Sequence, residues 1–411
     1  MKPGAVIVGA SHAGAQAAAS LRQSGWQEPI TLISSENFLP YHRPPLSKGF
    51  LAGDQAEDQI LLRGEAFYRD QEIELHLGRV VTEVLPDQRV ARTDSVAMPY
   101  SALILATGAS ARRLSVPGSA LEGVHVLRDM ADAKILKEQL AGAENVVIVG
   151  GGFIGLEVAA TAAKAGKSVT VLEAQDRLIA RALPSFLSAY LKDLHLHHGV
   201  DIRFGVSLAS FEGDGGRLKH VLLSDGRKLS ADLVLVGVGS TANCELARRL
   251  GLKLEAGGVL VDQRCETSAP GVFAIGDCAA QPNLHTGTIL RVESVQNATD
   301  QAKMLAAHLT GRSLPPYGTN WFWTDQYSVK LQMAGIVKDG CEVLVRGDPA
   351  SQNFSLLQLL GDRLVSAFSV NRAADHMAAR KLISSKARLD RNLAADPSTP
   401  LTGAVLEREY Q

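Results

Sequence analysis

The sequence predicts an α/β protein with two Rossmann-like dinucleotide-binding domains and a C-terminal α+β domain. Three observations support this prediction. An apolar strand, a glycine-rich turn, an alanine-rich helix and a second strand near an acid occur in residues 5–36 and again in residues 146–173. Beyond residue 317 the pattern changes to short alternating segments. Two nucleotides are therefore expected, one for each repeat, and none in the last domain, which has no glycine fingerprint.

The repeat at residues 146–173 carries the more complete fingerprint. Gly150 lets the chain turn off the strand, Gly152 lets the backbone approach a pyrophosphate, and Gly155 lets the helix pack closely on the sheet. Glu173 ends the second strand, where it can accept from the hydroxyls of an adenosine ribose. Its charge would repel a 2′-phosphate, so this repeat is expected to bind NADH rather than NADPH. The alternative is that Arg177 holds a 2′-phosphate.

The N-terminal repeat has the same order of elements with a weaker fingerprint. Gly9 and Gly14 are present, but Ser11 replaces the middle glycine and leaves less room for a pyrophosphate. Its acid is Glu36, and its closing strand ends at Thr107 and Gly108. We expect FAD here, and a plain βαβ unit without a ligand is the alternative. The predicted domains are an FAD domain at 1–112 and 240–318, an NADH domain at 113–239 and an α+β domain at 319–411.

Composition narrows the class of protein. The chain has 411 residues, 46% of them hydrophobic and 21% charged, with a net charge of -1. Such a balance argues against nucleic acid as a partner, because that binding draws on an excess of Lys and Arg. We find neither a signal peptide nor an apolar run long enough to span a membrane, so a soluble cytoplasmic protein is expected.

Neither cysteines nor histidines indicate a metal site. The four cysteines lie far apart and form no C-x-x-C pair, so a disulfide framework, a redox-active pair and a metal knuckle are all unexpected. His195, His197 and His198 are interpreted as an exposed helix end, because no carboxylate or cysteine lies at ligand spacing. His12 is expected to face solvent.

The C-terminal domain is expected to be an antiparallel sheet followed by a helix. Alternation of apolar and polar residues predicts strands at 325–336, 341–346, 354–361 and 363–371. A helix is predicted at 373–387.

Several runs together resemble a known family. They are RPPLSK at 43–48, VFAIGDC at 272–278 and WFWTDQ at 321–326, combined with the two fingerprints. These resemble the FAD-dependent ferredoxin reductases of bacterial oxygenase systems, the group of putidaredoxin reductase and the aromatic-ring dioxygenase reductases. Rubredoxin reductases and apoptosis-inducing factor are more distant relatives. The resemblance covers nearly the whole chain.

The resemblance implies a glutathione reductase-like fold and NADH:ferredoxin oxidoreductase activity. FAD would take hydride from NADH and pass single electrons to a [2Fe-2S] ferredoxin, which serves a cytochrome P450 or a ring-hydroxylating dioxygenase. Since the chain has no cysteine pair, electrons would leave directly from the flavin. The alternatives are a rubredoxin reductase and an NADH-sensing flavoprotein of the apoptosis-inducing-factor type.

The resemblance also implies FAD contacts at positions outside the glycine motif. The expected FAD-binding residues are Gly9, Ala13, Gly14, Glu36, Arg43, Lys48, Val81, Thr107, Gly108, Arg128, Asp277 and Val295. The expected NADH-binding residues are Gly150, Gly152, Ile154, Gly155, Glu173 and Gly239. Asp277 could accept from a ribitol hydroxyl, or it could be a solvated turn residue. The helix predicted at 295–307 could direct its positive end toward the flavin.

Three residues are expected to act in catalysis. Lys48 ends a proline-stiffened loop, and Glu157 lies on the first turns of the central helix, where the nicotinamide must pass to reach the flavin. Paired, they could orient the carboxamide; two solvated charges are the alternative. The resemblance places Trp323 near the isoalloxazine and the partner-facing surface, whereas a core tryptophan is the plain alternative.

Overall fold

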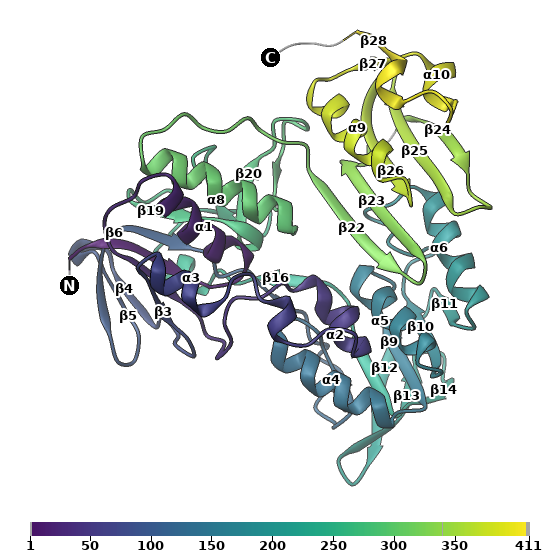
Figure 1. The fold of residues 1–411 in the computed structure, drawn as a ribbon. Coiled ribbons are helices and arrows are strands. Elements are labelled where there is room, and N and C mark those ends of the chain that lie inside the picture. Colours follow the sequence, from purple (N-terminus) through teal and green to yellow (C-terminus); the bar gives the residue numbers. More distant parts are fainter. Residues whose placement is uncertain (1, 339, 408–411) are drawn as a thin grey trace. The chain divides into compact units, whose positions relative to one another are not determined.

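A computed structural model describes residues 2–338 and 340–407 (Figure 1). The chain forms two compact units. The first unit combines residues 1–42, 57–110 and 241–320, and the second combines 43–56, 111–240 and 321–411. Segment 43–56 thus packs with the second unit, although the predicted FAD domain ran through 1–112. The division into three functional domains stays a prediction.

The first unit is built on a seven-stranded sheet with the order β3-β2-β1-β6-β5-β4, in which β19 pairs with β6. Strands β1, β2, β3, β6 and β19 run parallel, and β4 and β5 extend the sheet antiparallel. The strands are β1 (Gly4–Val8), β2 (Ile30–Ile33), β3 (Ile73–His76), β4 (Glu83–Leu85), β5 (Val90–Arg92), β6 (Ala97–Leu105) and β19 (Val272–Ala274).

Two helices cover one face of this sheet. Helix α1 (His12–Gln23) packs directly beside α8 (Val295–Leu309) (Figure 1). Ala15, Ala17 and Ala18 of α1 are fully buried, and such small side chains let backbones approach closely. The other elements of this unit are η2 (Asp58–Ile60), α3 (Glu65–Asp70), η3 (Pro86–Gln88), α7 (Glu245–Arg249), β17 (Leu254–Glu255), β18 (Gly258–Leu260), η4 (Gly276–Cys278), β20 (Ala279–Pro282) and β21 (Ile289–Leu290).

The second unit contains a five-stranded parallel sheet with the order β11-β10-β9-β15-β8. Its strands are β8 (Val124–His125), β9 (Asn145–Val149), β10 (Ser168–Glu173), β11 (Asp201–Phe204) and β15 (Leu233–Val236). Its helices are α4 (Met130–Gly142), α5 (Phe153–Lys164) and α6 (Ser185–His197). A separate antiparallel sheet is formed by β12 (Leu208–Asp214), β13 (Arg217–Leu223) and β14 (Lys228–Ser230).

Segment 43–56 lies against the parallel sheet's helices. It forms η1 (Pro44–Ser47) and α2 (Gly49–Ala52), and these contact α4 and α5. Its prolines begin η1, where the missing N–H groups cost nothing. Lys48, between η1 and α2, is thereby placed beside α5. The short strands β7 (Ala109–Ala111) and β16 (Ser240–Ala242) lie where the chain passes from one unit to the other.

The second unit ends in an antiparallel sheet with the order β22-β23-β26-β25-β24. The single strand predicted at 325–336 is wrong: β22 (Trp321–Gln326) and β23 (Val329–Gly335) form a hairpin. The chain reverses at Tyr327, whose φ of 57° is left-handed, and the alternation alone did not reveal this turn. The remaining elements are β24 (Glu342–Asp348), β25 (Asn353–Leu360), β26 (Arg363–Val370), α9 (Ala373–Ser384), β27 (Arg388–Leu389), α10 (Arg391–Ala395), η5 (Leu401–Ala404) and β28 (Val405–Glu407).

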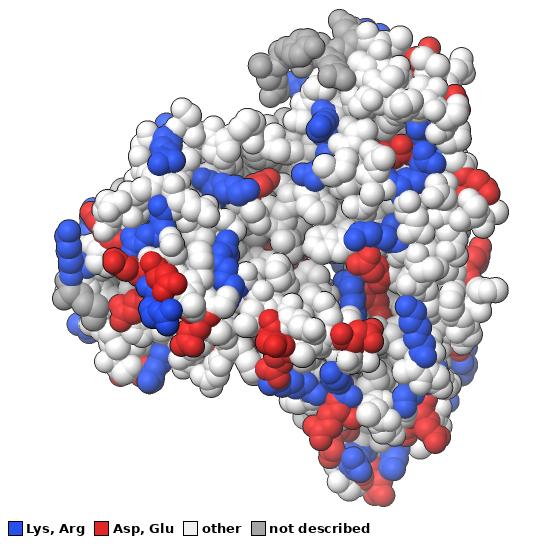
Figure 2. Space-filling view, in the orientation of Figure 1, with Lys and Arg blue, Asp and Glu red and all other residues white. Residues whose placement is uncertain are grey.

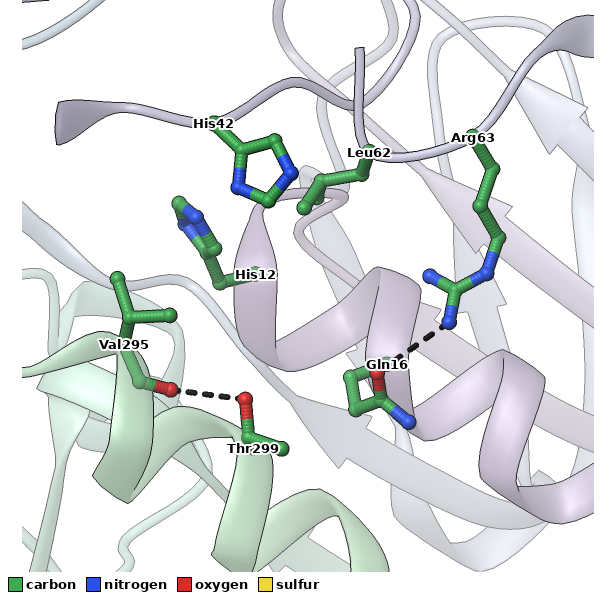
Figure 3. Close-up of a pocket in the computed structure, with 7 residues that line it drawn as sticks. All are labelled: His12, Gln16, His42, Leu62, Arg63, Val295 and Thr299. Carbon is green, nitrogen blue, oxygen red and sulfur yellow. Dashed lines mark hydrogen bonds between the residues drawn. The ribbon is translucent and has the colours of Figure 1, made fainter. Parts of the chain in front are cut away.

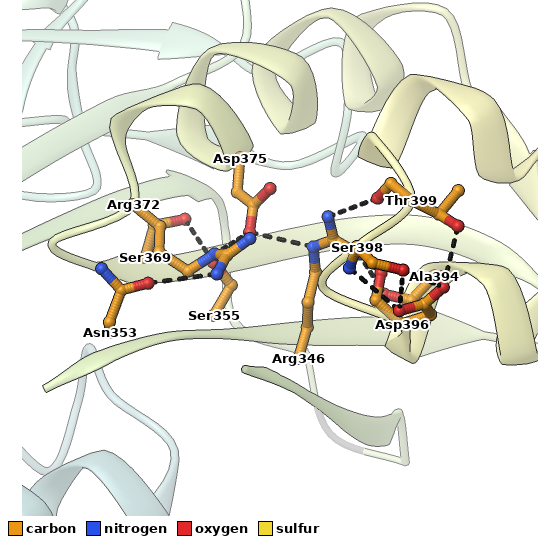
Figure 4. A network of polar contacts seen from close by, with 10 residues as sticks. All are labelled: Arg346, Asn353, Ser355, Ser369, Arg372, Asp375, Ala394, Asp396, Ser398 and Thr399. Atoms are coloured by element: carbon orange, nitrogen blue, oxygen red, sulfur yellow. Dashed lines mark hydrogen bonds and ion pairs between the residues drawn. The ribbon is translucent and has the colours of Figure 1, made fainter. Parts of the chain in front are cut away.

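A buried arginine of this sheet binds the segment 394–399 (Figure 4). Arg346 on β24 is only 1% exposed. Its Nε lies 3.0 Å from Asp375 Oδ2, and its Nη atoms donate to the carbonyl oxygens of Ala394, Asp396 and Thr399. Burial acts to raise the pKa of Asp375, but hydrogen bonds from Arg372 and Arg346 outweigh it and hold the pKa below its usual value. The guanidinium is thus paired and hydrogen-bonded, which is what a buried charge requires.

We predict that Arg346→Met destabilises the C-terminal domain by about 3 kcal/mol or more, because it strands three backbone acceptors and weakens the pairing of a buried carboxylate. Urea denaturation would measure the loss. Arg388→Met is the matched control, since Arg388 pairs with Asp362 at the surface, where an ion pair contributes less than about 1 kcal/mol. Equal losses in the two variants would contradict this account.

Candidate functional site

The glycine motif after β9 adopts a conformation that only glycine allows. Gly150 has φ +106°, and a Cβ there would lie 2.5 Å from the carbonyl oxygen of Gly237. A Cβ on Gly155 would lie 2.4 Å from the carbonyl oxygen of Gly150. The turn therefore brings the backbone N–H groups at the start of α5 to the carboxyl edge of the parallel sheet. That donor set suits a pyrophosphate.

Glu173 closes this site at the end of β10. Its Oε2 accepts from the backbone N–H of Gly151 at 2.7 Å, and its Oε1 accepts from that of Gln175 at 2.7 Å. Each carboxylate oxygen keeps a lone pair for a ribose hydroxyl. The donor set of this turn therefore fits a nicotinamide dinucleotide.

Arg177 is committed to its own loop. It donates to the carbonyl oxygens of Leu183 at 2.7 Å and Ala180 at 2.6 Å, and to Ser188 Oγ at 3.1 Å. These bonds direct the guanidinium away from the role of a 2′-phosphate ligand. Of the remaining expected residues, Ile154 is 42% exposed at the start of α5, and Gly239 has φ +102° just beyond β15.

The N-terminal glycine turn is equally tight. A Cβ on Gly9, which has φ +113°, would lie 2.1 Å from the carbonyl oxygen of Ala106. A Cβ on Gly14 would lie 1.8 Å from the carbonyl oxygen of Gly9. Ala13 is buried in the first turn of α1. The cradle fits the pyrophosphate of FAD, with Ser11 standing at the N-cap of α1.

The acid of this repeat lies just beyond β2. The hydroxyl of Tyr41 donates to Glu36 Oε2, and Ser34 Oγ accepts from the backbone N–H of Glu36 at 3.1 Å. Thr107 donates to the carbonyl oxygen of Asn243 at 2.7 Å, beside Gly108.

The other expected FAD positions divide between the two units. In the first unit, Val81 is buried, Asp277 lies in η4 and Val295 opens α8. In the second unit, Arg43 Nη1 donates to the carbonyl oxygen of Arg128 at 2.6 Å.

His12 does not simply face solvent, contrary to the prediction. It is half-buried and lines a cavity of about 250 Å³ in the first unit (Figure 3). Helix α1 supplies it together with Gln16, so the first turn of the helix directs it inward. The cavity is lined by His12, Gln16, His42, Leu62, Arg63, Val295 and Thr299. Burial, and secondarily the charge of Arg63, lowers the pKa of His42, which favours its neutral form.

Glu157 on α5 is buried, with 4% of its surface exposed. Its Oε2 lies 2.7 Å from Lys48 Nζ and accepts from Ser47 Oγ at 2.5 Å. Its Oε1 accepts from Thr324 Oγ1 at 2.6 Å. The predicted pair is therefore formed, and the alternative of two solvated charges does not hold. Sequence reasoning missed Ser47 and Thr324 as partners of the carboxylate.

The hydrogen bonds continue beyond Thr324. Gln326 Nε2 donates to Thr324 Oγ1 at 3.1 Å, and Gln326 Oε1 lies 2.9 Å from His195 Nε2. The hydroxyl of Tyr327 lies 3.2 Å from His195 Nδ1. The chain of contacts thus runs from the hairpin turn, through α6, back to the hairpin and on to α5.

His195 is not part of an exposed helix end, so that prediction is wrong. It is fully buried, whereas His197 and His198 are exposed as expected. The buried residues of α6 include Leu187, Leu191 and Leu194, and this helical spacing places His195 on the same face. That periodicity was the signal that could have identified it. Within residues 2–338 and 340–407, no group of acidic, histidine or cysteine side chains is arranged to hold a metal.

Trp323 is half-buried rather than a core residue. Its ring lies 5.5 Å from that of Trp321, at an interplanar angle of 30°. Phe322, between them, contacts Phe153 at the start of α5 with 4.9 Å between ring centroids. The hairpin therefore presents an aromatic pair and is seated on α5 by a third aromatic ring.

None of the four cysteines forms a disulfide, and three of them are buried. Burial raises the pKa of Cys265 and Cys278, so both thiols stay protonated and unreactive near neutral pH. No pair of them is poised for thiol–disulfide exchange.

Sequence comparisons identify the family. The pyridine nucleotide-disulphide oxidoreductase family matches residues 4–302, and the reductase C-terminal family matches residues 321–405. The chain belongs to the pyridine nucleotide-disulphide oxidoreductase family. It is 44% identical to rhodocoxin reductase of Rhodococcus erythropolis over 401 residues, which cover 97% of this chain and 94% of that protein.

Comparison with solved structures supports the same family assignment. A ferredoxin reductase from Rhodopseudomonas palustris superposes with a TM-score of 0.94 at 41% identity, covering 98% of this chain and 100% of that one. Putidaredoxin reductase in its covalent complex with putidaredoxin superposes with a TM-score of 0.92 at 38% identity, covering 97% of each chain. The predicted family, glutathione reductase-like fold class and oxidoreductase activity are confirmed. FAD and NADH, the cofactors expected from the two fingerprints, are those of this oxidoreductase group.

The surface and helices add two observations. Figure 2 shows Lys and Arg interspersed with Asp and Glu over the visible face, in keeping with the net charge of -1. Among the described residues, no helix has both the length and the apolar character needed to cross a membrane.

We predict a pH-dependent stability from the buried histidine of this oxidoreductase. Burial lowers the pKa of His195 to about 4 from an ordinary 6.5. Below pH 6.5 the unfolded chain binds a proton that the folded protein refuses, so this contribution to stability is lost as pH falls from about 6.5 to 4, at roughly 1.4 kcal/mol per unit. The slope of the unfolding free energy against pH, measured across this range, should be smaller in His195→Gln. The difference should correspond to about one proton fewer taken up on unfolding. An unchanged slope would contradict the buried, neutral state.

Proposed function

We propose that the protein is an NADH-dependent ferredoxin reductase that supplies electrons to a cytochrome P450 or a ring-hydroxylating dioxygenase through a [2Fe-2S] ferredoxin. The observation that carries this proposal is the full-length similarity to a ferredoxin reductase and to rhodocoxin reductase, together with the absence of a C-x-x-C or C-x-x-x-x-C pair among the four cysteines. A disulphide reductase would need such a pair to pass electrons on. We place the protein in the cytoplasm, where NADH and soluble carriers meet.

FAD, when bound, accepts two electrons as hydride and releases them singly. The residues of the protein bind and orient the two dinucleotides. Gly150 and Gly152 admit the pyrophosphate of NADH at the start of α5, where the positive end of the helix dipole favours an anion. Glu173 accepts from the adenosine ribose. By the same physical argument, Gly9, Gly14 and the start of α1 hold the pyrophosphate of FAD.

The preference for NADH rests on two neighbouring side chains. Backbone N–H groups hold both oxygens of Glu173, so the carboxylate cannot turn aside to admit a 2′-phosphate. Arg177 donates to its own loop and to Ser188, so it offers no replacement positive charge. A 2′-phosphate would therefore meet a fixed negative charge at close range.

Lys48 and Glu157 are proposed to orient the nicotinamide carboxamide. Three donors hold the buried carboxylate of Glu157, and the ammonium of Lys48 beside it is fixed in position. Such fixed groups need no reorganisation when the reacting atoms approach. Trp323 is proposed to lie on the route by which electrons reach the carrier, because it is half-exposed and stacked on a second tryptophan.

The first test is to purify the protein and measure its spectrum and its carrier reduction. We expect a yellow flavoprotein that reduces a [2Fe-2S] ferredoxin, and cytochrome c through it, with a kcat/KM for NADH at least about tenfold above that for NADPH. A rubredoxin reduced faster than every ferredoxin tested would favour the rubredoxin reductase alternative. A protein that binds NADH and reduces no carrier would favour the sensing alternative.

The second test concerns the charged pair. Lys48→Met and Glu157→Gln should each slow flavin reduction by NADH roughly 10- to 100-fold in stopped flow, because the carboxamide loses its fixed partner. Lys192→Met, which removes an exposed lysine of α6, is the control and should leave the rate unchanged. If both members of the pair can be replaced without slowing reduction, the proposed role is wrong.

A further inference from the structure

The hydrogen bonds beyond Glu157 have a single direction. An amide nitrogen can only donate, so Thr324 Oγ1 accepts from Gln326 Nε2 and must direct its own proton elsewhere. The proton goes to Glu157 Oε1, which lies 2.6 Å away. Thr324 therefore transmits the orientation of Gln326 to the carboxylate.

The same argument determines which ring nitrogen of His195 carries the proton. Gln326 Oε1 can only accept, so His195 Nε2 carries the proton that lies between them. A neutral imidazole then has an unprotonated Nδ1, which accepts from the Tyr327 hydroxyl at 3.2 Å. Burial keeps the pKa of His195 near 4, in agreement with a neutral ring. Every donor in the chain of contacts points toward Glu157.

The middle residues of this series of hydrogen bonds are shielded from water. Thr324 and Gln326 are each 1% exposed, and His195 is fully buried. Each polar group has its partner within the chain, so none can exchange that partner for water without leaving a buried group unsatisfied. The far end is anchored too, because Tyr327 stacks on His198 with 3.6 Å between ring centroids and accepts from Lys164 through its carbonyl oxygen.

We propose that Thr324, Gln326 and His195 are positioning residues for the nicotinamide reaction. They hold the Glu157 carboxylate in one orientation, and that carboxylate in turn sets the position of Lys48. This inference rests on the proposed function, since it assigns these residues to its NADH half-reaction. It also gives the C-terminal domain a part in the first electron-transfer step, through the hairpin that carries two of the three residues.

The kinetic experiment uses the holoenzyme with Thr324→Val and Gln326→Leu. Flavin reduction by NADH should slow roughly 10- to 100-fold in Thr324→Val and somewhat less in Gln326→Leu, where the threonine hydroxyl remains. Thr324→Ser keeps the hydroxyl and should restore the rate to within about threefold. The control is Gln358→Leu, which removes another buried glutamine of the same domain, paired with Ser366 and remote from this chain of contacts.

Two further measurements do not depend on turnover. The dissociation constant for NAD⁺, measured by calorimetry, should rise roughly three- to tenfold in Thr324→Val and not in Gln358→Leu. In the wild-type protein, ¹⁵N NMR should show His195 protonated at Nε2 and bare at Nδ1. Because the NMR measurement needs no variant, it tests the direction of the hydrogen bonds even if a substitution prevents folding.

The outcomes separate this inference from the proposed function. Ferredoxin reduction by enzyme that has been reduced chemically beforehand should be equal in all variants, because only the NADH step is affected. A wild-type protein that reduces ferredoxin, with Thr324→Val no slower than Gln358→Leu, would overturn the positioning role alone. A proton on Nδ1 of His195 would overturn it as well. A wild-type protein that reduces no ferredoxin would overturn the function on which it rests.

Discussion

The organisation of the second unit depends on one buried negative charge. Moving a carboxylate out of water is costly unless donors surround it. At Glu157 three donors come from two places distant from it in the sequence: the neighbours Ser47 and Lys48 at the end of η1, and Thr324 on the first strand of the C-terminal sheet. The charge therefore constrains how η1, α5 and β22 pack together. Loss of any partner would leave the others directed at an unbalanced ion.

The aromatic residues of the hairpin add an apolar contact between β22 and α5. Phe322 contacts Phe153 at the first residue of α5, while Thr324 contacts Glu157 one turn later along the same helix. Adjacent positions of a strand alternate in direction, but positions two apart share a face. A single strand thus packs an aromatic ring and a hydroxyl against successive turns of one helix. The apolar contact sets the distance and the polar contact sets the orientation.

Much of the fold followed from local patterns in the sequence. The glycine spacing and the acid at the end of the second strand have direct physical causes, a close backbone approach and an acceptor for a hydroxyl, so they predicted both βαβ repeats. Tyr327 did not reveal its turn, because a left-handed tyrosine has no compositional signal. His195 was misjudged because it was grouped with His197 and His198 at the predicted exposed helix end, although its spacing from Leu187 and Leu191 was that of a buried face. Lys48 was predicted as a partner of Glu157, but its hydroxyl partners Ser47 and Thr324 were not, since they come from segments more than a hundred residues away from it along the chain.

Glu173 serves two purposes with the same two oxygen atoms. We propose that it accepts from the ribose, and it also holds the glycine turn through the N–H of Gly151 and the following loop through that of Gln175. Selectivity for the nucleotide and the shape of its cradle are consequently coupled in one side chain. A lineage that changed its reductant could not simply discard this acid, because the turn would lose its support along with the barrier. A protein that came to use NADPH would need both new side chains to hold the two loops and a new positive charge for the 2′-phosphate. A single substitution is therefore not sufficient to alter the coenzyme preference.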